Sequence, residues 1–172
     1  MRKVVIYTDG ACSNNPGPGG YCAILMCDGA EKIVTGAELY TTNNRMELMG
    51  VIKGLNALKR KSEVDIYSDS AYVCNAILQG WLENWQKRHW RNSTKHEVLN
   101  KDLWLKLIEK LKFHKVTFHK VRGHADNEFN NRCDNLARRQ ILKLLKKEER
   151  KANSKPVAPV EATEEQVEIS EE

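Results

Sequence analysis

The residues of this sequence best suited to chemistry are four carboxylates: Asp9, Glu47, Asp69 and Asp134. Asp9 and Asp69 each end an apolar, β-branched run of the kind that forms a buried strand. Sites in open α/β sheets form beyond the carboxyl ends of neighbouring strands, so these two side chains are expected to meet. Glu47 lies in the first turn of a predicted helix that can bring it to the same edge. Converging carboxylates repel one another and raise one pKa, so such a cluster is stable mainly when divalent cations occupy it.

The ligand type indicates which cation would bind. Oxygen ligands alone suit Mg²⁺, or Mn²⁺, better than Zn²⁺. Two such ions bridging a phosphodiester stabilise both the attacking and the leaving oxygen of an in-line displacement. The four carboxylates together therefore favour metal-dependent chemistry at a phosphodiester.

Each carboxylate also has an ordinary structural interpretation. Asp9 with the glycine after it is the signal of a type I′ hairpin turn. Glu47 fits a capping box at the start of its helix, and Asp69 fits an N-cap. Asp134 fits a surface pair with the arginine one helical turn later. Taken singly, each of these roles is at least as well supported as a catalytic one, and only the set of four favours a metal site.

The elements that would position these side chains can be followed along the chain. An antiparallel meander is predicted from strands at 3–9, 21–27 and 31–36, and the dense turn residues at 14–20 release Asp9 from the role of a hairpin turn. The remaining predicted elements are a helix from Asn43 through Leu58, a strand at 64–68, a helix after Ser70, a helix at 102–111, a strand at 116–121 and a helix through Leu136–Leu145. This order implies a five-stranded mixed α/β sheet, flanked by helices, in which strands one and four pair in parallel.

Charge is unevenly distributed along the 172 residues. Residues 156–172 hold six glutamates and no lysine or arginine, whereas the preceding 155 residues carry 28 basic and 17 acidic groups, a net of +11. That balance suits a polyanionic partner such as nucleic acid, although a merely soluble basic protein has the same composition. The final segment is too polar to bury a core. We therefore expect one catalytic domain at 1–147 and a disordered, basic-then-acidic tail at 148–172.

Cysteine usage and the amino terminus bear on the compartment. Five scattered cysteines form no CxxC pair and no spacing typical of a metal site, which favours reduced thiols. The first residues lead directly into a strand, without an apolar signal segment, and no apolar run approaches a membrane span. The expectation is a cytoplasmic protein without membrane contact.

Six motifs, in this order, resemble type 1 ribonuclease H of the bacterial kind, ribonuclease HI, from about residue 3 to residue 142: TDGACSNNPGPGG, TTNNRMELM, SDSAYV, GWLENW, GHADNE and RCDNLA. The resemblance implies the ribonuclease H-like fold. It also implies endonucleolytic hydrolysis of the RNA strand of an RNA–DNA hybrid by a metal-activated water, which leaves a 5′-phosphate and a 3′-hydroxyl. A monomer is the family expectation.

The resemblance assigns roles to the residues that match the motifs. Asp9, Glu47, Asp69 and Asp134 match the four carboxylates that hold one or two Mg²⁺ ions, with Asp9 and Asp69 as the central ligands. His124 matches a loop histidine that assists proton transfer or product departure. A lone loop histidine is ordinarily a solvated residue, so this role rests on the resemblance alone, and a pKa near neutrality suits it.

Substrate-binding residues carry over in the same way. Cys12, Asn15, Asn43 and Asn44 match positions that line the minor groove of the hybrid, where the 2′-hydroxyls distinguish RNA from DNA. Thr42 matches part of a pocket for a phosphate of the DNA strand.

The segment at about 80–101 matches the basic protrusion of the family, in which Trp81, Trp85 and Trp90 border a channel for the DNA strand. The ordinary interpretation of these tryptophans is local packing. We expect packing to dominate for Trp81, Trp85 and Trp104, and Trp90 to be the most exposed. The surrounding basic residues are expected to bind phosphates without reading sequence.

The sequence departs from the family pattern at two places. Ala71 stands where many relatives have a groove-contacting glutamine, and Asn131 stands where relatives often have glutamate. Two other functions remain open: a non-catalytic hybrid- or duplex-binding module, and another nuclease, transposase or resolvase on the same fold. All four carboxylates are present, which argues against the binding module, and the tryptophan-bearing protrusion argues against the other enzymes. The number of ions, the preferred metal, the cleavage-site preference and the partner of the tail stay open.

Overall fold

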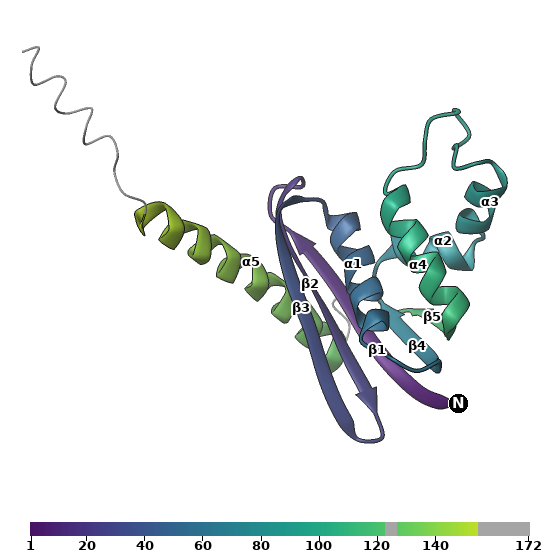
Figure 1. Ribbon diagram of the computed structural model, residues 1–172, viewed down its shortest axis with the longest axis horizontal. Helices are drawn as coiled ribbons and strands as arrows, with labels where there is room; N and C mark the ends of the chain where they lie inside the picture. Colours follow the sequence, from purple (N-terminus) through teal and green to yellow (C-terminus); the bar gives the residue numbers. More distant parts are fainter. Residues whose placement is uncertain (123–126, 155–172) are drawn as a thin grey trace, which may run out of the picture.

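A mixed five-stranded sheet forms the centre of the computed structural model, which describes residues 1–122 and 127–154 (Figure 1). The strands are β1 (Arg2–Cys12), β2 (Gly17–Cys27), β3 (Ala30–Thr41), β4 (Ser62–Ser68) and β5 (Lys115–Lys120), in the order β3-β2-β1-β4-β5. The meander β1–β2–β3 is antiparallel, and β4 pairs in parallel with both β1 and β5. The predicted fold class and the parallel pairing of strands one and four are confirmed.

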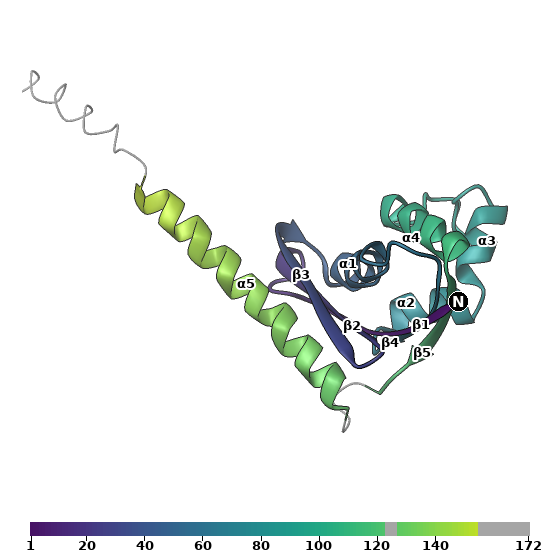
Figure 2. The ribbon, with the colours of Figure 1, turned by 60° about the horizontal axis from the view of Figure 1, so that its bottom comes forward.

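The helices lie on both faces of this sheet (Figure 2). They are α1 (Asn43–Asn56), α2 (Ala71–Leu78), α3 (Trp81–Lys87), α4 (Lys101–Phe113) and α5 (Glu128–Ser154). One face packs against α1, α2 and α4 through large apolar side chains such as Leu48, Leu55 and Trp104. The other face packs against α5 through smaller side chains, including Cys22, Cys133 and Ala137. The small residues let α5 lie close to β1 and β2, which brings the start of that helix beside the edge that holds Asp9.

Four strands are longer than the sequence indicated. β3, predicted at 31–36, covers Ala30–Thr41, and β4 starts two residues early, at Ser62. β1 continues to Cys12 and β2 starts at Gly17, because Gly19 and Gly20 pair with Cys12 and Ala11 as strand residues. A Cβ atom on Gly20 would lie 2.4 Å from the backbone oxygen of Ala137 in α5. Gly20, predicted as turn material, is therefore a strand residue directly beneath α5, whereas a Cβ atom on Gly19 would meet the side chains of Thr41 and Met46.

The last helix also differs from expectation. Residues 148–154, predicted to belong to a disordered tail, continue α5 as helix to Ser154. Residues 155–172 and the loop at 123–126 lie outside the described residues. Within the part of the chain that is described, no helix is long and apolar enough to cross a membrane.

Candidate metal centre and nucleic-acid interface

Asp9 and Asp69 come together where β4 leaves the sheet. The last residues paired between β1 and β4 are Tyr7 and Tyr67, so Asp9 lies just past the parallel ladder, although its own strand continues. The prediction that Asp9 ends its strand is therefore wrong: it faces Cys22 inside the β1–β2 ladder. What ends near Asp9 is β4, and Asp69 directly follows it.

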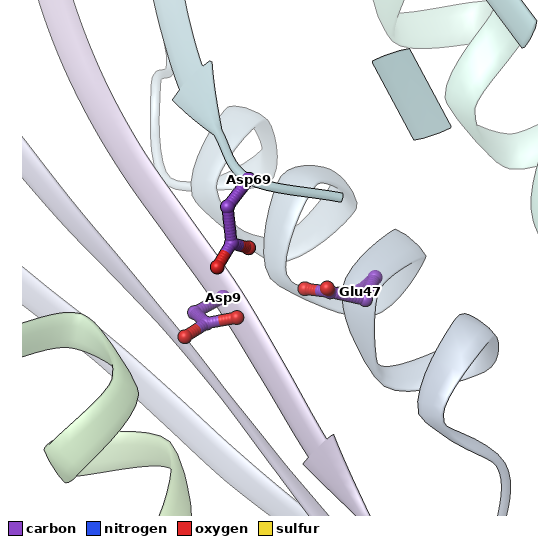
Figure 3. A group of neighbouring side chains, drawn as sticks. All are labelled: Asp9, Glu47 and Asp69. Carbon is purple, nitrogen blue, oxygen red and sulfur yellow. The ribbon is translucent and has the colours of Figure 1, made fainter. Parts of the chain in front are cut away.

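The ordinary role proposed for Asp69 falls to its neighbour. Ser70 is the N-cap of α2, and its Oγ accepts a hydrogen bond from the backbone N–H of Val73 at 3.1 Å. Asp69 is therefore not needed as a cap, and its carboxylate points toward Asp9 and Glu47 (Figure 3).

Glu47 is placed by the close approach of α1 to β1. Thr42 caps α1 by accepting a hydrogen bond from the backbone N–H of Arg45 at 3.2 Å, so Glu47 lies beyond the first turn and forms no capping box. A Cβ atom on Gly10 would lie 2.4 Å from the backbone nitrogen of Glu47. Only glycine permits this contact, and it sets the Glu47 carboxylate beside Asp9 in a site that leaves the glutamate 7% exposed.

The three carboxylates form a compact cluster (Figure 3). One oxygen from each of Asp9, Glu47 and Asp69 lies within 4.8 Å of the others. Burial, followed by the charge of Asp69, raises the pKa of Asp9 to about 7. Burial, followed by the charges of Asp9 and Asp69, raises the pKa of Glu47 well above its usual range. Packing has thus gathered groups that repel one another when ionised, as the sequence predicted.

Asp134 contributes to the same pocket from α5. A cavity of about 170 Å³ is lined by Asp9, Gly10, Asn43, Glu47, Asp69, Asn130, Asn131, Asp134 and Arg138. Asp134 is outside the compact cluster of three, and both of its carboxylate oxygens accept hydrogen bonds from Nε of Arg138 at 3.2 Å. The surface pair expected from the sequence is therefore present, on the rim of the cavity that the other three carboxylates line.

The donors in this cavity fit a divalent cation. The ligand set consists of oxygens, and Mg²⁺ and Mn²⁺ prefer oxygen ligands. Oε1 of Glu47 and Oδ1 of Asn130 are buried and have no hydrogen-bond partner among the described residues. A buried oxygen without a partner is costly, and a cation at this position would satisfy it. Asn130 was not predicted from the sequence, although it precedes Asp134 by four residues and so shares a helix face with it.

The residues expected at the minor groove gather beside this cavity. Oδ1 of Asn15 accepts a hydrogen bond from the backbone N–H of Asn43 at 3.0 Å, which joins the β1–β2 turn to the start of α1. The Cys12 thiol lies 3.3 Å from the backbone oxygen of Thr41, and Asn44 is exposed in the first turn of the helix. The cap residue Thr42 is half-buried between them. His124, the expected loop histidine, lies outside the described residues.

The protrusion is built on tryptophans that pack unequally. The ring of Trp85 lies 5.5 Å from that of the buried Trp104 and 6.5 Å from that of Trp90. Trp90 is half-buried by this contact, whereas Trp81 is 38% exposed. The expectation that Trp90 is the most exposed is wrong, because α3 turns its neighbour Leu82 toward the core and leaves Trp81 outward.

Comparison with known proteins identifies the family. The family model for RNase H matches residues 1–142. The chain belongs to the ribonuclease H family. A Ribonuclease H of Caldicellulosiruptor saccharolyticus is 56% identical over 144 residues, which cover 84% of this chain and 99% of that protein. As a ribonuclease H, the chain is a hydrolase that cleaves the RNA strand of RNA–DNA hybrids.

Solved structures of ribonucleases H share the fold. LC9-RNase H1, a type 1 RNase H with the type 2 active-site motif, superposes with a TM-score of 0.73 at 26% identity, covering 81% of this chain and 72% of that one. LC11-RNase H1, solved in complex with an RNA/DNA hybrid, superposes with a TM-score of 0.64 at 24% identity, covering 83% and 99%. The recognition of a bacterial type 1 ribonuclease H from the six sequence motifs is confirmed.

Proposed function

We propose that Asp9, Glu47, Asp69 and Asp134 form the catalytic centre of this ribonuclease H and hold one or two Mg²⁺ ions, with Mn²⁺ as a substitute. The observation that carries the proposal is the compact cluster of Asp9, Glu47 and Asp69, in which one oxygen of each residue lies within 4.8 Å of the others. Oε1 of Glu47 is buried there without a hydrogen-bond partner in the described part of the chain. Asp134 joins the site from α5 by exchanging its contact with Arg138 for the cation.

Bound divalent cations would supply Lewis-acid stabilisation of the phosphate and a nucleophilic water for in-line attack. The protein residues hold the cations and fix their position by the packing of β1, β4 and α1. The products are a 5′-phosphate and a 3′-hydroxyl. His124 assists proton transfer or product departure, so His124→Ala is expected to slow cleavage without abolishing it. Complete loss of activity in that variant, with Mg²⁺ binding retained, would contradict an assisting role.

The hybrid is held by residues on both sides of this centre. We assign Cys12, Asn15, Asn43 and Asn44 to the minor groove, where 2′-hydroxyls mark the RNA strand, and Thr42 to a DNA-strand phosphate. The hydrogen bond between Asn15 and Asn43 supports this assignment, because it fixes two of these residues side by side. Trp81, Trp85 and Trp90 border the DNA-strand channel. Among them Trp81 is the most exposed, at 38%.

Compartment and assembly form a further part of the proposal. All five cysteines are free thiols. That state suits the reducing cytoplasm, where we place the protein. We propose a monomer, which light scattering coupled to gel filtration measures directly.

The proposal is tested with end-labelled RNA–DNA hybrid, single-stranded RNA, duplex RNA and duplex DNA, each incubated with Mg²⁺. We expect cleavage of the hybrid alone, at internal positions of the RNA strand, and no cleavage after chelation with EDTA. Asp69→Asn is expected to bind hybrid without cutting it, and Asp28→Asn, an exposed control with the same charge change, to cut normally. Cleavage by Asp69→Asn at the parent rate would overturn the metal assignment.

A further inference from the structure

The C-terminal half of α5 stands away from the rest of the molecule. Figures 1 and 2 show it running out past the β3 edge of the sheet. Ile141 is the last buried residue of the helix, and none of the residues at 142–154 is buried. The family model matches the chain only as far as residue 142. This part of the helix therefore contributes no buried side chain to the core, and none of its residues lines the cavity of the carboxylates.

Four exposed basic side chains share one face of this helix: Arg139, Lys143, Lys146 and Arg150, here called the basic stripe. Their spacing of four, three and four residues keeps them in line, because an α-helix turns once in 3.6 residues. Arg139 follows the buried Ala137 by two positions, about 200° around the helix, so the stripe lies opposite the face packed on the sheet. It spans twelve residues, from Arg139 to Arg150, roughly 17 Å along the helix axis.

The charges of the basic stripe are not neutralised by neighbours. Among the described residues, none of the four forms an ion pair. The two acidic residues nearby lie off the stripe: Glu148 pairs with Lys151 at 3.5 Å, and Glu149 lies about a quarter turn away. Four unpaired cations in a row repel one another, and a polyanion laid along the helix would relieve that repulsion.

We propose that the basic stripe is a second nucleic-acid-binding surface, separate from the catalytic centre, that holds the phosphate backbone of duplex nucleic acid. A duplex carries one negative charge per roughly 1.7 Å of axis, so a stripe of this length runs beside about ten phosphates. Contacts of this kind position a duplex without reading its sequence. The family activity places the protein on long nucleic-acid polymers, which supply this partner at the site of action.

The stripe and the catalytic centre bind different stretches of nucleic acid. Arg150 lies 16 residues after Asp134, roughly 24 Å along the helix axis, and the stripe faces away from the sheet. The basic protrusion lies at the opposite end of the molecule (Figure 1). A short hybrid seated on the carboxylates therefore leaves the stripe free, and a long or folded nucleic acid engages both surfaces, which raises the effective concentration of substrate at the catalytic centre.

The test compares the full chain with two variants of equal charge loss. The first variant is Arg139→Gln, Lys143→Gln, Lys146→Gln and Arg150→Gln, in which glutamine preserves helix propensity. The matched control removes four lysines from other elements: Lys59→Gln, Lys61→Gln, Lys106→Gln and Lys115→Gln. Binding of a labelled DNA duplex of about 30 base pairs is measured over salt concentrations from about 50 to 200 mM. Because this probe is not cut, the result is independent of the proposed catalytic function.

The affinity of the parent falls as salt rises, so the slope of log affinity against log salt is negative. We expect this slope to be less steep in the stripe variant by about 3 to 4, at roughly 0.9 for each phosphate that the variant no longer neutralises. The control is expected to change the slope by less than about 1. Cleavage of a hybrid of about ten base pairs, too short to reach the stripe, is expected to stay within about twofold of the parent in both variants. Far-ultraviolet circular dichroism checks that α5 remains helical.

Two results would overturn the proposal. The first is a parent-like salt slope in the stripe variant, or an equal loss of slope in the control. The second is faster proteolysis after Ser154 in the stripe variant without weaker binding of the DNA duplex, which would assign the stripe to the acidic residues 156–172 of the same chain instead of nucleic acid.

Discussion

The carboxylate cluster and the protrusion, which we propose to act on the same hybrid, are built in opposite ways. The carboxylates are fixed by sheet and helix packing, to the point that Glu47 is 7% exposed and the pKa of Asp9 is raised to about 7. The segment at 88–100 has little regular structure, is mostly exposed, and carries four non-glycine residues with positive φ: His89, Trp90, Lys95 and Asn100. Chemistry that needs atoms held within fractions of an ångström uses the rigid elements, whereas phosphate binding tolerates a looser surface.

The largest effect is expected when one charge is removed from the rigidly held carboxylate cluster. Asp9→Asn is expected to reduce hybrid cleavage by about a thousandfold or more, because metal-ion stabilisation of the transition state is worth several kcal/mol. The fold is expected to survive, since the substitution removes repulsion from Glu47 and Asp69. Single-turnover cleavage with Mg²⁺ and thermal unfolding without metal measure the two effects. Retained cleavage would show that Asp9 is not a central ligand.

Two tryptophans separate packing from binding within the protrusion. Trp85→Ala is expected to lower the free energy of unfolding by about 2–4 kcal/mol, because the ring packs against Trp90 and the buried Trp104. Trp81→Ala is expected to change stability by less than about 1 kcal/mol and to weaken hybrid binding instead, since its ring is exposed. Urea unfolding and fluorescence anisotropy distinguish the outcomes, and the reverse pattern would exchange the two roles.

The contact between α1 and β1 gives a third test. Gly10→Ala is expected to destabilise the protein by about 1–3 kcal/mol, because the new Cβ meets the Glu47 backbone nitrogen and forces α1 outward. At a temperature where the variant remains folded, its cleavage rate is expected to fall by more than the loss of folded protein explains. Gly29→Asn is the matched control: it lies in a turn with φ 81° and open space, where asparagine is tolerated. Equal activity of both variants would separate Gly10 from the geometry of the centre.

The smallest expected effect is on stability as a function of pH. The folded-state pKa of Asp9, about 7, lies above its ordinary value of 3.8. Folding is therefore favoured by protonation at low pH, and this contribution is lost as pH rises through 7. Without metal, the parent is expected to gain about 1 kcal/mol relative to Asp9→Asn between pH 8 and pH 6. Saturating Mg²⁺ should reverse the trend, because protons compete with the cation. Parallel pH profiles for parent and variant would contradict the raised pKa.

Much of the fold was predictable, because the apolar runs that indicate strands are separated by residues typical of turns. The apolar run before Asp9 and the run before Asp69 each predicted a strand, and the parallel pairing that joins them followed from the order of elements. The glycines at 19 and 20 were assigned to a turn, because local turn propensity gives no sign that Gly20 must lie beneath α5 and Gly19 against Thr41 and Met46. Tertiary packing overrode the local signal there.

The site was predictable in composition but not in geometry. Residue types and spacing singled out the carboxylates, yet nothing in the sequence showed that Thr42 and Ser70 would take the capping roles and so release Glu47 and Asp69. The orientation of the tryptophans could not be predicted either, since it depends on which side of a seven-residue helix meets the core. The end of α5 is rich in lysine and glutamate, which have high helix propensity, and Glu148 pairs with Lys151 there. By composition alone, such a sequence cannot be distinguished from a polar tail, so the length of the helix was not predicted.

The three clustered carboxylates come from β1, α1 and the end of β4, elements far apart in the chain. Bringing such distant segments together costs loop-closure entropy, so we expect the cluster to be incomplete in the transition state for folding. A divalent cation would then bind its full set of ligands only after that barrier. Metal binding is thus expected to leave the refolding rate nearly unchanged and to slow unfolding, which makes the enzyme kinetically more durable wherever the cation is abundant.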